Sequence, residues 1–144
     1  MAMSVISAQR LVHSDAPRIF ELLADPNQHP VISGDGSVRQ SHAGNPTRLS
    51  NGDRFGMDMK IGVAYQITNR VVEFEEGRQL AWRHFNGHVW RYRLTPTAGG
   101  TLVREEWDPS DAHHQWFLRW TFRAGPVRRN LERSLQRLAA QVER

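Results

Sequence analysis

Between residues 34 and 108 the chain alternates short apolar runs with turn residues, and this pattern limits its possible folds more than any other feature. The runs are rich in Val, Ile, Phe, Tyr and Trp, and glycine, asparagine and proline separate them at the spacing of β-hairpins. We therefore predict an antiparallel meander. Because an antiparallel sheet buries at least one face, the flanking segments must supply its cover.

The first runs of the meander show which side chains share a face. Phe55, Met57 and Met59 alternate with glycine, aspartate and lysine, which predicts one apolar face and one polar face. Residues 64–74 have a mixed pattern, which indicates a strand with a bulge. In the last run, Val103, Glu105 and Trp107 are predicted to point inward, so that one carboxyl group faces the apolar side.

The turn at Asn86-Gly87 decides the register of the two central runs. A two-residue turn would place Trp82 opposite Arg91 and mix the two faces. A three-residue loop, with Gly87 in the left-handed conformation, keeps aromatic side chains opposite one another. We predict the three-residue loop and these cross-strand pairs: Leu80 with Tyr92, Trp82 with Trp90, and His84 with His88.

The segment before the meander is predicted to contain a strand and short helices. The strand covers residues 4–12. Ser14, followed by an acid and then a proline, is typical of a helix start with Ser14 as the cap, and this helix runs through Leu23. Two prolines, Pro26 and Pro30, restrict any second helix to about one turn.

The segment after the meander is predicted to be helical, with Ser110 or Asp111 as cap and an interruption at Pro126. Past the interruption, from about residue 127 to 143, apolar side chains recur every three or four residues on one side and charged residues occupy the other. We expect this helix to cross the concave face of the sheet. Before it, Trp116 and Trp120 belong to a surplus of aromatic residues that fits a cavity wall, a lid or a homodimer contact.

Composition excludes several classes of protein. The chain of 144 residues has no cysteine, which rules out disulfides, thiolate nucleophiles and cysteine metal sites. Its length fits a single domain over residues 1–144, and it has neither an apolar run that could span a membrane nor a signal-peptide pattern. We expect a cytoplasmic protein with no membrane span, no cofactor and no metal.

The net charge of +4 comes almost wholly from arginine, since Lys60 is the only lysine. The arginines are scattered and many lie beside acids, whereas nucleic-acid binders concentrate positive charge in a patch or stripe. We therefore expect no specific binding of nucleic acid. Only the C-terminal quarter collects enough arginine to meet an anionic surface.

The order of elements resembles the START-related SRPBCC superfamily, in particular small bacterial polyketide cyclase/dehydrase and lipid-transport-like proteins. Three stretches carry the resemblance: SDAPRIFELLADPNQHPVISGDGSV, NGDRFGMDMKIGVAYQITNRVVEFEEGRQLAWRHF and TAGGTLVREEWD. The resemblance implies an α+β helix-grip fold, in which a curved antiparallel sheet wraps around a long C-terminal helix. It also implies a cavity between sheet and helix for a lipid, polyketide, aromatic or isoprenoid-like molecule.

The side chains predicted to line this cavity are large, adaptable and apolar. They are Phe55, Met57, Met59, Trp82, Trp90, Tyr92, Trp107, Trp116 and Trp120. A solid core would use the same residues, so both interpretations stay open. The neighbouring histidines His84 and His88 suit two metal ligands, but no third ligand is evident in the sequence.

Three classes of function remain. The first is a carrier or sensor of a small hydrophobic ligand. The second is a cyclase, dehydratase or isomerase that uses Glu105 as base and Tyr92 or His84 as proton donor. The third is a nucleic-acid or protein-interaction module that uses the arginine-rich tail. We favour the carrier.

Overall fold

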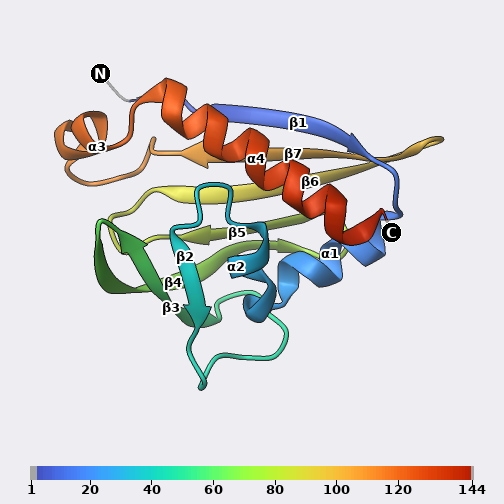
Figure 1. The fold of residues 1–144 in the computed structure, drawn as a ribbon, viewed down its shortest axis with the longest axis horizontal. Helices are drawn as coiled ribbons and strands as arrows, with labels where there is room; N and C mark the ends of the chain where they lie inside the picture. Colours follow the sequence, from blue (N-terminus) through green and yellow to red (C-terminus); the bar gives the residue numbers. More distant parts are fainter. Residues whose placement is uncertain (1–2, 144) are drawn as a thin grey trace.

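The computed structural model describes residues 3–143 and contains one curved, seven-stranded antiparallel sheet (Figure 1). The strands are β1 (Ile6–Val12), β2 (Val38–Ser41), β3 (Arg54–Ile61), β4 (Val63–Glu75), β5 (Gln79–Arg83), β6 (Val89–Thr97) and β7 (Gly100–Asp108). The helices are α1 (Ala16–Ala24), η1 (Pro26–Gln28), α2 (His29–Ile32), α3 (Gln115–Thr121) and α4 (Ala124–Val142). The order β1-β7-β6-β5-β4-β3-β2 confirms the meander from β2 to β7 and the helix-grip architecture.

The predicted register of the central hairpin is confirmed. Trp82 pairs with Trp90 and Leu80 with Tyr92, while the backbone N–H of His84 donates to the carbonyl of His88 at 2.9 Å. Gly87 has φ of 96°, a conformation that side chains with a Cβ rarely adopt. The expected bulge is also present, because the register of β4 against β5 shifts between positions 71 and 73.

Two predicted helix caps are wrong. Asp15, not Ser14, caps α1: its Oδ1 accepts a hydrogen bond from the backbone N–H of Arg18 at 3.1 Å. Neither Ser110 nor Asp111 starts the C-terminal helices, because the Oδ1 of Asp108 binds Ser110 in a turn and delays the helix to residue 115. At both sites an aspartate carboxylate accepts a nearby backbone N–H, that of Arg18 at Asp15 and that of Ser110 at Asp108.

The interruption in the C-terminal helices lies a few residues before the predicted position. α3 ends at Thr121 and α4 begins at Ala124, so that Pro126 falls in the first turn of α4. The missing N–H of a proline costs nothing in a first turn, where backbone N–H groups have no helical partner. Pro126 therefore fits the first turn of α4 and does not kink the helix.

The buried stripe of α4 divides the apolar interior into two clusters. Its first half joins Ile6, Trp107 and Leu118 through Val127 and Leu131. Its second half contributes to the main core another set of side chains: Leu135, Leu138, Ala139 and Val142. In Figure 1, α4 crosses β1 and β7, while α1 and α2 lie over the other end of the sheet.

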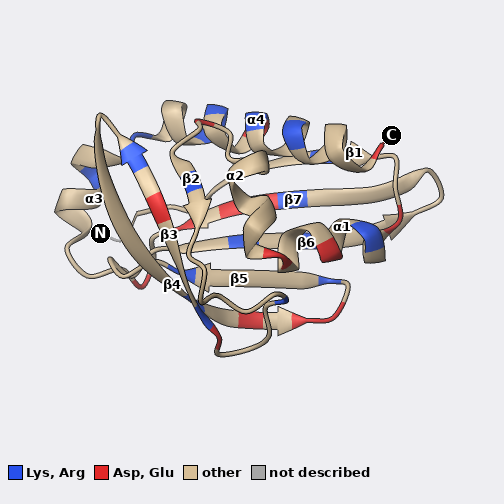
Figure 2. Ribbon diagram, turned by 60° about the horizontal axis from the view of Figure 1, so that its bottom comes forward, with Lys and Arg blue, Asp and Glu red and all other residues tan. Residues whose placement is uncertain are grey.

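Ion pairs cover the opposite face of the sheet. The Arg91 guanidinium contacts carboxylates of Glu73 at 2.6 Å, Glu106 at 3.2 Å and Asp108 at 3.1 Å. Its hydrogen bonds lower the pKa of Glu73, although partial burial opposes the change. Figure 2 shows basic residues along the outer side of α4 and mixed charges on the strands. Many arginines of the sheet are therefore matched with acids and form no uniform basic surface.

Replacing Leu135 with aspartate is expected to abolish folding. Leu135 is 1% exposed in the main core, and an unpaired carboxylate buried there would cost several kcal/mol, a large part of the stability of a domain. Thermal melting followed by circular dichroism checks this, with Gln136→Asp on the exposed side of the same helix as control. A cooperative Leu135→Asp transition at the wild-type temperature would contradict the assigned packing.

Candidate functional site

A cavity of about 130 Å³ lies between the sheet, α2 and α4. Its walls come from α2 and the loop after it, from strands β2 to β7, and from Phe122 and α4. The predicted residues among them are Met57, Met59, Trp82, His84, Trp90, Tyr92 and Glu105. The alternating pattern of the strands therefore indicated part of the apolar wall, and ligand binding by these residues stays a prediction.

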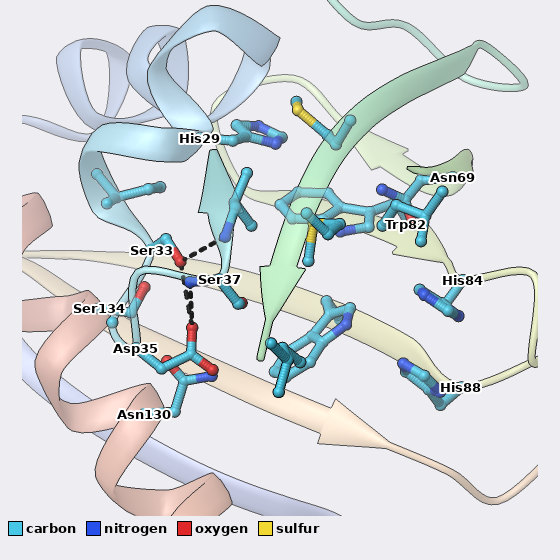
Figure 3. Close-up of a pocket in the computed structure, with 18 of the residues that line it drawn as sticks. His29, Ser33, Asp35, Ser37, Asn69, Trp82, His84, His88, Asn130 and Ser134 are labelled. Atoms are coloured by element: carbon cyan, nitrogen blue, oxygen red, sulfur yellow. Dashed lines mark hydrogen bonds between the residues drawn. The ribbon is translucent and has the colours of Figure 1, made fainter. Parts of the chain in front are cut away.

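Polar side chains gather at one side of the cavity, where Figure 3 shows Asn69, His84 and His88. The rings of His84 and His88 stack with centroids 4.5 Å apart. Burial lowers the pKa of His84 to about 4 and, with the added effect of His84, lowers that of His88 to about 3. Both imidazoles are therefore neutral at pH 7. The Asn69 Oδ1 and His88 Nδ1 atoms are buried and have no hydrogen-bond partner within residues 3–143.

His29 anchors the aromatic wall. Its ring stacks on Trp82 at 4.7 Å and meets Phe55 edge-on at 5.4 Å, while Nε2 bonds the Leu23 carbonyl at 2.8 Å. The carbonyl requires a proton on Nε2. Burial lowers the pKa of His29 to about 4, more than this hydrogen bond raises it. The neutral ring thus holds Trp82 in a fixed orientation, with Phe55 behind the wall and not in it.

Glu105 points inward from β7, as predicted. The Tyr92 hydroxyl donates to its Oε1 at 2.7 Å, and the Ser134 hydroxyl lies 3.1 Å from the Tyr92 oxygen. Burial raises the pKa of Glu105 to about 8, and the hydrogen bond from Tyr92 offsets only part of this effect. Glu105 is therefore largely a neutral carboxylic acid at pH 7, and its Oε2 has no hydrogen-bond partner among residues 3–143.

The opposite side of the cavity is formed by the loop after α2 and by α4. Asp35 accepts a hydrogen bond from the Ser37 N–H at 2.9 Å and from the Ser33 hydroxyl at 3.3 Å, drawn as dashed lines in Figure 3 together with the bond from Val38 to Ser33. A Cβ at Gly34 would collide with the backbone oxygen of Asn130 on α4. The loop can approach α4 this closely because residue 34 has no side chain.

Besides Phe55, three predicted wall residues lie outside the cavity lining. Trp107 is fully buried in the cluster formed with the first half of α4, because this end of the helix covers it. Trp116 and Trp120 are 73% and 75% exposed, respectively, on α3. The short helix α3 lies beyond the end of the sheet (Figure 1). Their role in a homodimer contact stays a prediction.

Several wall residues were missed by sequence reasoning. His29 lies on a one-turn helix between prolines, where no periodic pattern exists to show its direction. Asn69 shares a face with Ile67 on β4, and a polar residue in an apolar alternation was the available signal. Ser134 falls within the buried stripe of α4. The contact of Gly34 with α4 is a tertiary feature that no sequence pattern indicates.

Within residues 3–143, no three histidine or acidic side chains form a group that could hold a metal ion. None of the helices in this part of the chain is long and apolar enough to cross a membrane. The stacked pair His84 and His88 belongs to no such group in the described part of the chain.

Comparisons with known proteins agree on one architecture. A model of the family "Polyketide cyclase / dehydrase and lipid transport" matches residues 3–143. "Uncharacterized protein Rv0088" of Mycobacterium tuberculosis is 36% identical over 104 residues, 67% of this chain and 44% of that protein. The chain thus spans less than half the length of this curated relative.

Solved structures show the same fold at low sequence identity. Protein CV1439 from Chromobacterium violaceum has a TM-score of 0.75 and 14% identity, and the match covers 99% of both chains. The Aha1 dimer from Colwellia psychrerythraea has a TM-score of 0.69 and 13% identity over 98% of this chain and 97% of that one. That protein is described as a dimer in solution.

The buried histidines are expected to make the protein sensitive to acid. His88 protonates near pH 6.5 in the unfolded chain but near pH 3 in the folded one. The unfolded state therefore binds more protons as pH falls below 6.5, and stability decreases. His88→Phe removes this contribution. Between neutral pH and pH 5, the variant should therefore lose about 2 kcal/mol less of its free energy of unfolding than the wild type loses.

Urea denaturation at pH 7.5 and pH 5 measures this difference. His113→Phe, at an exposed histidine, is the control and should keep the wild-type dependence on pH. Equal losses of stability in His88→Phe and the wild type would contradict the assignment of His88 as a buried neutral imidazole.

Proposed function

We propose that this chain, which belongs to the polyketide cyclase/dehydrase and lipid transport family, binds and carries a small, largely apolar molecule in the cavity between its sheet and α4. The family match over residues 3–143 confirms the resemblance seen in the sequence. Family membership supports ligand binding in general, while folds of this kind host many different ligands.

The observation that carries the proposal is a group of polar atoms without partners. Asn69 Oδ1, His88 Nδ1 and Glu105 Oε2 are buried with no hydrogen-bond partner among the described residues, and all three side chains line one cavity. Each such atom costs about 1–3 kcal/mol when it stays unsatisfied, and such atoms are rare in folded proteins. A ligand with hydrogen-bonding groups would compensate this cost on binding.

The remaining wall supports an apolar ligand body. Trp82 and Tyr92 have ring centroids 5.8 Å apart, and Met57 and Met59 line the cavity from β3, which β4 separates from β5. Aromatic faces and methionines adapt to ligands of different shape. Apolar walls with a few convergent polar groups are the usual composition of a small-molecule site.

Filling the cavity is expected to reduce ligand binding without unfolding the protein. Val38 is half-buried in the wall, and its replacement by tryptophan should occupy the cavity and lower the affinity for 1-naphthol, an uncharged fluorescent probe, at least about tenfold. Probe fluorescence and quenching of tryptophan emission measure the binding. Val63→Trp is the control, because Val63 is 73% exposed at the start of β4. Equal probe affinity in both variants would contradict the proposal.

A proton-transfer enzyme is the second candidate, and one observation favours it. Glu105 combines a pKa raised to about 8 with a direct hydrogen bond from Tyr92 inside a cavity. Such a carboxyl group can remove a proton from carbon when ionised and return it afterwards. His84 lines the same cavity, but its ring stacks on His88. Within residues 3–143, it makes no hydrogen bond to Tyr92 or Glu105.

If this second function holds, the protein should exchange the protons next to the carbonyl of 2-tetralone with deuterium from D2O. The rate should rise from pH 6 to about 8, as Glu105 ionises, and Glu105→Gln should lower it about 10²- to 10⁴-fold. Affinity for the neutral probe should stay within about threefold of the wild type. NMR follows the exchange, with Glu132→Gln on exposed α4 as control. Wild-type exchange no faster than in buffer would exclude this reaction.

A further inference from the structure

The cavity differs from the outer surface in its charges. No lysine or arginine occurs among the described residues that line it, although the chain has 19 such residues. Its titratable side chains are histidines, tyrosines and acids: His29, Asp35, Tyr65, His84, His88, Tyr92 and Glu105. A negatively charged ligand would therefore meet no permanent positive charge on these walls.

The histidines are poorly placed to supply a positive charge. His29 uses Nε2 on the Leu23 carbonyl and packs between aromatic rings. His84 and His88 stack at 4.5 Å, so that charging both would bring two cations into contact. A buried imidazolium in this position would also lack a carboxylate partner, since Glu105 binds Tyr92.

Two charged side chains lie near the cavity, Asp35 in the loop after α2 and Arg137 on α4, and neither offers a positive charge to a ligand inside it. Asp35 lies at the exposed edge of the cavity and raises the pKa of Tyr65, after the larger effect of burial. Arg137 on α4 reaches this edge from outside, but its Nη1 donates to the Ser33 carbonyl at 2.6 Å. Arg137 is not among the lining residues.

An anion would lose its hydration in this cavity and gain no charged partner. Carboxylates and phosphates are normally bound by arginine, lysine or a helix N-terminus, whose positive charge compensates the free energy lost when the anion is dehydrated. An uncharged hydroxyl or amide group faces a smaller loss. It can also donate to Asn69 Oδ1, which has no other partner among residues 3–143.

We propose that the cavity selects uncharged molecules of one or two rings that carry hydroxyl, carbonyl or amide groups, and that it rejects carboxylates and phosphates of the same size. The inference rests on the proposed binding function and adds a rule of selectivity to it. A volume of about 130 Å³ is comparable to an engineered cavity that holds benzene. A second ring would extend toward the exposed edge at Asp35 and Ile61.

Isosteric ligands separate charge from shape. 1-Naphthamide and 1-naphthoate have nearly the same size, but only the second is charged at pH 7. Titration calorimetry with the full chain should show naphthoate binding at least tenfold more weakly than naphthamide. Naphthoate affinity within threefold of naphthamide would overturn the selectivity while leaving the binding function intact. Failure of naphthalene, 1-naphthol and naphthamide to bind at all would overturn both.

The role of Asn69 is tested with a second pair of ligands. Asn69→Leu keeps the side-chain size but removes the acceptor, so 1-naphthol should bind at least threefold more weakly while naphthalene affinity is unchanged. Gln66→Leu, an exposed change on the same strand, is the control and should alter neither affinity. Unchanged naphthol binding in a folded Asn69→Leu variant would contradict the proposed contact.

Discussion

The width of the α4 stripe is the constraint on which the rest of the structure depends. One helix covers a band of sheet about 10 Å wide, and α4 places its band over β1 and β7. The strands beyond it still expose an apolar face, which α1, α2 and the following loop cover in part. The uncovered remainder is the cavity. Gly34 sets its edge, because a side chain there would collide with Asn130 on α4.

The two faces of the sheet differ in charge: the outer face carries paired charges, and the inner face carries titratable groups in their neutral forms. On the outer face, Arg91 binds three carboxylates and the charges remain partly hydrated. On the inner face, burial shifts the pKa of His88 downward and that of Glu105 upward, toward the neutral form of each. The fold can therefore bury several titratable groups without burying net charge. What it leaves unsatisfied is hydrogen bonding, and that need is the basis of the proposed ligand preference.

The solved structures compared share the scaffold of this chain at low sequence identity. At 14% identity, the likeness to CV1439 is a likeness of fold, and the fold supplies a concave sheet with a helix across it. In the proposed binding site, Asn69, His88 and Glu105 supply the polar atoms that would orient a ligand, since a few polar groups give an apolar wall its specificity. The chemistry of this chain is therefore a property of its own residues.

By itself, the sequence determined the meander, its register and the direction of Glu105, because a period of two residues assigns each strand position to one face and only the three-residue loop at Gly87 keeps the aromatic residues on the same face. It also indicated Trp82 and Trp90 as wall residues. Tertiary structure alone decided that Trp107 lies under α4 and that Trp116 projects outward, since alternation assigns a face but not the element covering it. The cavity likewise depends on where a narrow helix stops covering a wide sheet.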